Sequence, residues 1–267
     1  MSVGGFTVGS VISPGVTTRV PNECEGAPSA RQTQPWPNGH DLDKSTPETS
    51  PLELGLTAGA GLAEAGLAEV DLGLLEFAVV DLETTGWSPE KAAITEIGAV
   101  RVRAGGRRGE FVRQGEFASL VNPGMPVPPG IADLTGITDW MLAAAPRLGT
   151  VLPGLLDFAA GCVLVAHNAP FDLGFLVAGC GDCGLAWPGF TVLDTVMLAR
   201  HVMDPDEVPD CKLGTLAGFF GARTAPNHRA LADARATADV LGWLIRRLTH
   251  RGIRTLRQLS AWPDVVA

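Results

Sequence analysis

Four acidic residues and one histidine stand in three short blocks of this chain. The first block contains Asp81 and Glu83, the second Asp172, and the third His228 and Asp233. Each acid comes where an apolar segment ends or a helical pattern begins, and a carboxylate in such a place is costly unless it is paired or bound to a metal. Carboxylates that converge on one point repel each other, and divalent cations are the usual remedy. The blocks together predict a metal-dependent site for phosphoryl transfer.

The first block is expected at the end of a buried strand. Asp81 and Glu83 follow the apolar run Phe77–Val80 and lie one residue apart, so their side chains point to the same side of the sheet. The next residues, Thr84-Thr85-Gly86, turn the chain away at the same place. A solvated strand end also carries such a pair of acids, and for this block taken alone it is the commoner explanation.

The second block, His167-Asn-Ala-Pro-Phe-Asp172, follows the apolar run Cys162–Ala166. Its proline suits the first turn of a helix. Asp172 then has two explanations: a metal ligand, or a carboxylate of the kind that is favoured at a helix N-terminus. For His167 we expect a structural hydrogen bond rather than a catalytic role.

The third block, His228-Arg-Ala-Leu-Ala-Asp233, opens a long helical pattern. Five residues correspond to about 500° of helical rotation, so the two side chains are not stacked on a regular helix. His228 lies on the preceding loop, however, where it can swing towards Asp233 and accept a proton from water. The alternative is a helix capped by Asn227 with a flanking histidine. Asp239, six residues further along, is expected at the surface.

The elements that must position these blocks follow from the hydrophobic periodicity. We expect strands at 77–80, 93–103, 110–121, 163–166 and 190–193, and helices at 147–160, 171–177, 195–201, 212–220 and 229–248. Tight turns join the first three strands, and a β-α-β-α pattern follows them. The predicted fold is therefore α/β, with a mixed five-stranded sheet that combines an antiparallel meander with parallel strands and is flanked by helices.

Composition divides the chain near residue 75. Residues 1–50 are rich in Pro, Gly, Ser, Thr and Asn, which indicates disorder. Residues 52–72 predict only a marginal helix, because each glycine costs about 1 kcal/mol. Residues 1–75 hold three basic and nine acidic residues and so carry most of the net charge of −9. We expect an acidic Pro/Gly-rich leader at 1–75, a folded domain at 76–250 and a C-terminal tail at 251–267.

The five cysteines are odd in number and irregularly spaced, so no disulfide framework is expected. Cys180 and Cys183 have the spacing of a zinc pair, but only Cys211 could join them, whereas structural zinc normally needs four ligands. Free thiols in a reducing compartment are the preferred interpretation. The sequence shows neither a signal peptide nor an apolar run of about 20 residues, so we expect a cytoplasmic protein without membrane contact.

The three blocks, in this order, resemble the motifs of the DnaQ-like (DEDD) superfamily of 3′–5′ exonucleases, which includes the exonuclease domain of the DNA polymerase III epsilon subunit. The resemblance covers about residues 76–249. It implies an RNase H-like fold and two bound Mg²⁺ or Mn²⁺ ions. The family divides by whether the third motif supplies a histidine or a tyrosine, and this chain contains no tyrosine. His228 is therefore the only candidate base, and the chain resembles the histidine branch, DEDDh.

The resemblance also implies a role for each residue. The metal ligands would be Asp81, Glu83, Asp172 and Asp233, with Asp81 shared by both ions. His228 would orient and deprotonate the attacking water, and the product would be a nucleoside 5′-monophosphate from a 3′ end. The residues expected to bind the terminal nucleotide, through backbone amides or as a wedge, are Leu82, Thr84, Thr85 and Phe171.

The substrate and the cellular setting stay open at this level. Single-stranded DNA is the preferred substrate, in proofreading or in stand-alone repair, and RNA is the alternative. Thr135 stands where some proofreading relatives carry a histidine, which weakens an assignment as the core proofreading subunit. Further alternatives are a module that binds nucleic acid without cleaving it, and an adaptor whose leader docks a DNA polymerase or clamp.

Several arginines surround the expected turn at Gly105-Gly106. They form either a patch that binds a nucleic-acid backbone or a set of solubilising charges on an exposed hairpin. These residues are Arg101, Arg103, Arg107, Arg108 and Arg113.

Overall fold

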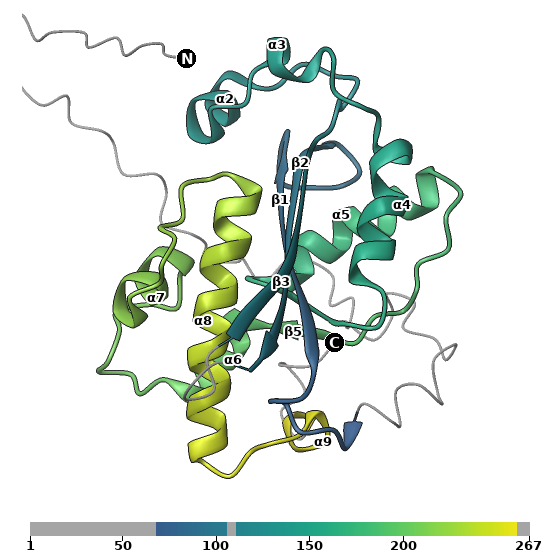
Figure 1. The fold of residues 1–267 in the computed structure, drawn as a ribbon. Helices are drawn as coiled ribbons and strands as arrows, with labels where there is room; N and C mark the ends of the chain where they lie inside the picture. Colours follow the sequence, from purple (N-terminus) through teal and green to yellow (C-terminus); the bar gives the residue numbers. More distant parts are fainter. Residues whose placement is uncertain (1–67, 106–110, 261–267) are drawn as a thin grey trace, which may run out of the picture. The chain divides into compact units, whose positions relative to one another are not determined.

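The computed structural model describes residues 68–105 and 111–260. The expected leader up to residue 67, and the last seven residues of the expected tail, lie outside the described residues. The strands are β1 (Glu76–Thr84), β2 (Ile94–Ala104), β3 (Phe111–Leu120), β4 (Val163–Ala166) and β5 (Val192–Asp194) (Figure 1). The helices are α2 (Pro129–Thr135), α3 (Asp139–Leu142), α4 (Leu148–Ala159), α5 (Ala169–Asp182), α6 (Thr195–Val202), α7 (Leu213–Phe220), α8 (Ala230–His250) and α9 (Leu256–Leu259). Within the described residues, none of these helices has the length and apolar character needed to span a bilayer.

The strands form a five-stranded sheet in the order β3-β2-β1-β4-β5, with β1 at its centre. β1 pairs antiparallel with β2, and β2 pairs antiparallel with β3, which is the predicted meander. β4 pairs parallel with β1, and β5 pairs parallel with β4. The predicted mixed sheet with flanking helices is therefore confirmed, and its central strand carries the first acidic block.

β1 is longer than the sequence pattern predicts. We expected the strand to end at Val80, but it continues to Thr84, with Glu83 opposite Glu96 of β2. Because β2 supplies ladder partners from another segment of the chain, β1 persists after its own apolar run has stopped. Asp81 and Glu83 therefore lie within a paired strand rather than beyond its end.

The two faces of β1 belong to two separate hydrophobic cores. Phe77 and Val79 pack with α6, α7 and α8, whereas Ala78 and Val80 pack with α4 and α5. Figure 1 shows α7 and α8 on one side of the sheet and α4 and α5 on the other. The two acids of the first block continue the odd-numbered row of β1, so their side chains share the face that α8 covers.

Both ends of the folded unit extend beyond the expected limits of 76 and 250. Leu72 is fully buried, and Asp71 forms an isolated bridge with Thr255. After this bridge, α9 places Leu256 and Leu259 in the same core as Leu72. The expected boundaries are therefore corrected. Pairing between two distant segments buries these leucines, and local composition carries no sign of such pairing.

α5 is also longer than the predicted 171–177. It has Pro170 in its first turn and continues past the predicted end at residue 177, through Gly179 and Gly181, to Asp182. At Gly179 an added Cβ would lie only 2.8 Å from Leu148 of α4, so the glycine lets the two helices pack closely. Tertiary packing here overrides the weak helical propensity of glycine.

The sheet and a helix approach each other closely at Gly98 of β2. A Cβ at this position would lie 2.2 Å from the backbone nitrogen of Leu231 and 2.6 Å from the carbonyl oxygen of Ala230. Only a residue without a side chain allows the start of α8 to rest directly on β2. Because Asp81 pairs with Gly98 across the sheet and Asp233 lies in the first turn of α8, this contact sets the spacing of two acidic blocks.

We expect Gly98→Ala to lower the free energy of unfolding by about 3 kcal/mol or more, because the opposing atoms are backbone and cannot move aside. Gly218→Ala is the matched control. Gly218 is exposed on α7, nothing lies within 4 Å of an added Cβ, and alanine should stabilise the helix by about 0.5–1 kcal/mol. Urea unfolding followed by circular dichroism measures both effects, and equal stability of the two variants would contradict the assigned contact.

Candidate active site

Three elements bring the predicted acids to one end of the sheet. Asp81 and Glu83 come from β1, Asp172 from the first turn of α5, and Asp233 from the first turn of α8. The NH of Leu82 donates a hydrogen bond of 3.1 Å to Asp172, which ties the start of α5 to β1 between its two acids. Asp172 and Asp233 are buried, and Asp81 feels the charges of the other three carboxylates.

Burial and mutual repulsion raise the pKa of every carboxyl in this cluster. Burial is the main cause for Asp81 and Asp172, whose pKa values lie well above the ordinary one, and neighbouring carboxylates add to it. Burial also raises the pKa of Glu83 to about 7, with further repulsion from Asp233 and partial relief from Arg229. The pKa of Asp233 is raised by burial as well. When ionised, the cluster therefore requires positive charge close by.

Three side chains of the cluster could hold a metal ion together. Ligand atoms of Glu83, His228 and Asp233 all lie within 4.8 Å of one another. Carboxylate oxygens are the preferred ligands of hard divalent cations such as Mg²⁺ and Mn²⁺. Asp81 and Asp172 add two further carboxylates that are coupled to this group. Both the donor set and the uncompensated buried charge fit divalent cations.

A backbone turn, and not helical stacking, brings His228 to the acids. His228 is exposed and its φ of 58° lies in the left-handed region. The preceding residue, Asn227, donates its NH to a carboxylate oxygen of Asp233 at 2.8 Å. The loop therefore folds back over the first turn of α8. The alternative of a capping Asn227 is wrong, because the N-cap position belongs to Arg229 and carries no side-chain cap.

Glu96 of β2 is a component of the site that the sequence analysis missed. Its side chain is buried, and it accepts hydrogen bonds from Arg229 at 2.7 and 3.0 Å and from the NH of Ala230 at 3.0 Å. These bonds neutralise Glu96 and anchor Ala230, the first residue of α8, two residues after His228. The available signal was an acid among the apolar residues of an otherwise buried strand.

His167 has the structural role that the sequence predicts. Its Nδ1 lies 2.8 Å from the hydroxyl of Thr195, and burial lowers the pKa of the imidazole to about 4, so the ring is neutral near pH 7. Asp194, which was not singled out, accepts from the NH of Asn168 at 3.1 Å and from the NH of Val196 at 2.8 Å. It holds together the turn that leads into α5 and the start of α6.

Two of the backbone amides that were expected to bind a terminal nucleotide have partners within the fold. The NH of Leu82 donates to Asp172, and the NH of Thr85 donates to the carbonyl of Ala93 at 2.9 Å. The hydroxyl of Thr84 donates to a backbone carbonyl two residues away. All three residues are buried. These bonds hold the turn after β1, and direct contact of the three residues with substrate stays a prediction.

Phe171 is placed differently from these three residues. It is half-buried at the start of α5, next to Asp172. The ring of Trp87 meets it edge-on, with centroids 6.2 Å apart, and Trp87 itself is 76% exposed. Trp87 was not predicted as a site residue, although a tryptophan directly after Gly86 was a visible signal in the sequence. The two rings form an apolar surface beside the acids.

Three of the other charged residues named from the sequence lie in ion pairs. Asp239 was expected at the surface, but its side chain is only 8% exposed and pairs with Arg223 at 2.6 Å. Arg101 pairs with Glu76 and Arg113 with Glu116, while Arg107 and Arg108 lie outside the described residues. These two pairings favour a structural explanation for Arg101 and Arg113.

Comparisons with known proteins agree with this geometry. A family model described as Exonuclease matches residues 78–241. A protein of Mycobacterium tuberculosis (strain CDC 1551 / Oshkosh), named as a bifunctional exonuclease/endonuclease, is 45% identical over 230 residues, which covers 79% of this chain and 35% of the relative. A PolC-type DNA polymerase III of Caldanaerobacter subterraneus subsp. tengcongensis is 40% identical over 186 residues, which covers 70% of this chain and 13% of the relative. The chain thus spans about a third of the first relative and about an eighth of the second.

Solved structures share the fold. Exonuclease I of E. coli in complex with a dT13 oligonucleotide has a TM-score of 0.56 at 18% identity, with 67% of this chain and 42% of that chain covered. The nuclease domain of 3′hExo, described as a DEDDh family member bound to rAMP, has a TM-score of 0.54 at 19% identity. The match covers 70% of this chain and 97% of that chain. The family model covers more than half of the chain and includes all three acidic blocks. On these grounds the chain belongs to the DnaQ-like family of 3′–5′ exonucleases.

Proposed function

We propose that this protein is a metal-dependent 3′–5′ exonuclease that releases nucleoside 5′-monophosphates from the 3′ end of single-stranded nucleic acid, with DNA as the preferred polymer. The observation that carries the proposal is the convergence of four carboxylates and His228 from β1, α5 and the start of α8. An array of acids without compensating charge is unfavourable for a passive binding surface, since nucleic acid is itself an anion.

The four acids Asp81, Glu83, Asp172 and Asp233 would hold two divalent cations. When bound, such ions lower the pKa of water and stabilise the charge that develops on a phosphate and its leaving oxygen. The chain's own part is to fix the positions of the acids and to move a proton. His228 is exposed on a turn beside Asp233, and its imidazole can take the proton of the attacking water.

The aromatic surface beside the acids supports a single-stranded end as substrate. Phe171 and Trp87 present a half-buried and an exposed ring next to Asp172. An unpaired base can stack on such rings, whereas a base within a duplex is already stacked. The similarity to PolC-type polymerases supports DNA as the polymer and a DNA polymerase or clamp as a partner. RNA is the alternative polymer.

Replacing Asp172 tests the metal site. We expect Asp172→Asn to slow 3′ shortening of a labelled single strand by about 10²-fold or more, because a buried ligand charge is lost. Asp182→Asn, an exposed change at the other end of the same helix, should leave the rate unchanged. The assay uses 5′-labelled DNA and RNA in parallel, with Mg²⁺, Mn²⁺ or EDTA. Activity in EDTA, or an unaffected Asp172 variant, would refute the mechanism, and the faster polymer identifies the substrate.

Replacing His228 tests the proton acceptor. We expect His228→Ala to lower kcat by about 10²- to 10⁴-fold with little change in KM, and the residual rate to rise with pH as hydroxide replaces the base. His250→Ala, at the opposite end of α8, should match the unmodified protein. A rise in KM with unchanged kcat would show instead that His228 only binds substrate.

The raised pKa of Glu83 gives the metal-free protein a specific pH dependence. Between the ordinary value of 4.5 and about 7, folded Glu83 holds a proton that the unfolded chain has released, so its contribution to stability falls as the pH rises. In EDTA, Glu83→Gln should therefore match the unmodified protein at pH 5 and exceed its free energy of unfolding at pH 8 by about 1–3 kcal/mol. Thermal and urea unfolding at both pH values measure the difference. A gap that is equal at the two pH values would contradict the assigned pKa.

A further inference from the structure

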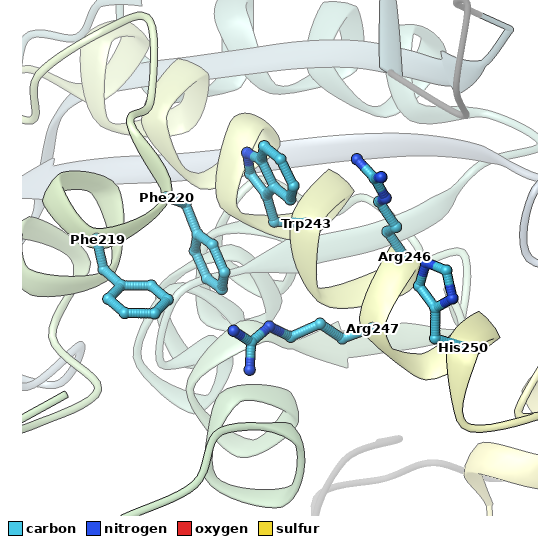
Figure 2. Close-up of a pocket in the computed structure, with 6 residues that line it drawn as sticks. All are labelled: Phe219, Phe220, Trp243, Arg246, Arg247 and His250. Atoms are coloured by element: carbon cyan, nitrogen blue, oxygen red, sulfur yellow. The ribbon is translucent and has the colours of Figure 1, made fainter. Parts of the chain in front are cut away.

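A pocket of about 390 Å³ lies between α7 and the last turns of α8, away from the acidic cluster. Figure 2 shows its six lining residues, which are Phe219, Phe220, Trp243, Arg246, Arg247 and His250. The lining consists of aromatic rings and basic side chains and contains no acid. None of the residues proposed for catalysis takes part in it, so the exonuclease reaction leaves this pocket without a use.

Two of the three aromatic rings of the pocket are exposed, yet the ring faces are already packed. Phe219 is 44% and Trp243 is 41% exposed. Trp243 lies between Phe220 and the guanidinium of Arg246 (Figure 2). The rings of Trp243 and Phe220 are stacked, with centroids 5.9 Å apart and planes at 5°. The guanidinium of Arg246 lies 5.2 Å from the centre of the Trp243 ring. The guanidinium of Arg247 lies over both phenylalanines at 5.7 and 5.5 Å. A nucleobase needs an open ring face to stack on, whereas an aliphatic side chain can fill the space between ring edges.

The two arginines differ in how their charge is compensated. Arg247 forms two hydrogen bonds of 2.7 Å with Glu207, so its charge is neutralised within the fold. Arg246 is exposed, and within 68–105 and 111–260 no carboxylate forms an ion pair with it. The pocket therefore suits an aliphatic side chain that is accompanied by a carboxylate near Arg246.

A segment of this chain with that chemistry enters the fold close to the pocket. Residues 52–67 contain five leucines and two glutamates and no basic residue. The described chain that follows them is fixed where the NH of Leu72 donates to the carbonyl of Arg254 and Asp71 bridges Thr255. Thr255 comes only five residues after His250, so the segment joins the fold at the end of α8 that lines the pocket. At about 3.3–3.6 Å per residue, the segment is long enough to reach it.

We propose that the leucine-rich acidic segment 52–67 docks in the pocket between α7 and α8, with a leucine beside Trp243 and a glutamate facing Arg246. The covalent tether places the segment at an effective concentration in the millimolar range, so a weak intrinsic affinity is enough to keep the pocket occupied. Docking covers the exposed rings and pairs the one arginine of the pocket whose charge the described fold leaves uncompensated. The proposal is independent of the exonuclease reaction.

Carbene footprinting of the full chain tests the occupant, because it reports the accessibility of single side chains. Substituting the leucines at 52, 54 and 56 by serine should raise labelling of Trp243 by about twofold to tenfold, since the released segment no longer excludes the probe. Trp87, which is exposed beside the acids, serves as the internal standard and should not change. The matched control replaces Val8, Val11 and Ile12 by serine and should leave Trp243 protected.

Charge reversal tests the contact with Arg246. Arg246→Glu should raise labelling of Trp243, and a second change of Glu53 and Glu64 to arginine should restore protection. Three results would overturn the proposal. The first is equal labelling of Trp243 in all variants. The second is protection of Trp243 that survives the leucine substitutions and grows with protein concentration. The third is protection of Trp243 that arises only when a single-stranded oligonucleotide is added. The second result identifies a second copy of the chain as the occupant, and the third identifies nucleic acid.

Discussion

Four carboxylates from three segments of the chain crowd one end of the central strand, and their charge must be compensated for the site to stay assembled when they are ionised. Burial and repulsion raise the pKa of each of them, so the metal-free site retains protons that isolated acids would lose. The surrounding fold keeps the acids together despite this cost. Gly98 lets α8 rest on β2, and the NH of Leu82 fixes Asp172 between the two acids of β1.

An arginine at the site, Arg229, pairs with Glu96 and not with the four carboxylates of the cluster. Arg229 neutralises Glu96, and this pair anchors the start of α8 next to His228. In the described part of the chain, none of the four cluster carboxylates has an arginine or lysine within ion-pair distance. The chain thus neutralises the one acid that holds the scaffold and leaves the others available for cations. This division separates the positioning of the site from its proposed chemistry.

Much of this arrangement could be predicted from local pattern. The alternation of β1 placed Asp81 and Glu83 on one face, and the apolar run before His167 predicted β4 at its observed residues. Other features depend on partners from distant segments. β1 continues beyond Val80 because β2 pairs with it. Leu72 is buried because Asp71 forms a bridge with Thr255. The NH of Thr85 donates a hydrogen bond to the carbonyl of Ala93. Such pairing has no local signature, which is why local pattern could not predict these features.

The chemical types of the site residues, their order along the chain and the absence of any tyrosine that could replace His228 follow from the sequence without a structure. These are properties of residue identity and spacing, and folding does not alter them. The tertiary structure alone decided which groups meet and which are already used. It brought His228 to Asp233 through a left-handed turn, assigned Glu96 to Arg229, and left Trp87 exposed beside Phe171. The physical reason is that hydrogen bonding, burial and ion pairing are relations between segments far apart in the chain, and only the folded molecule fixes them.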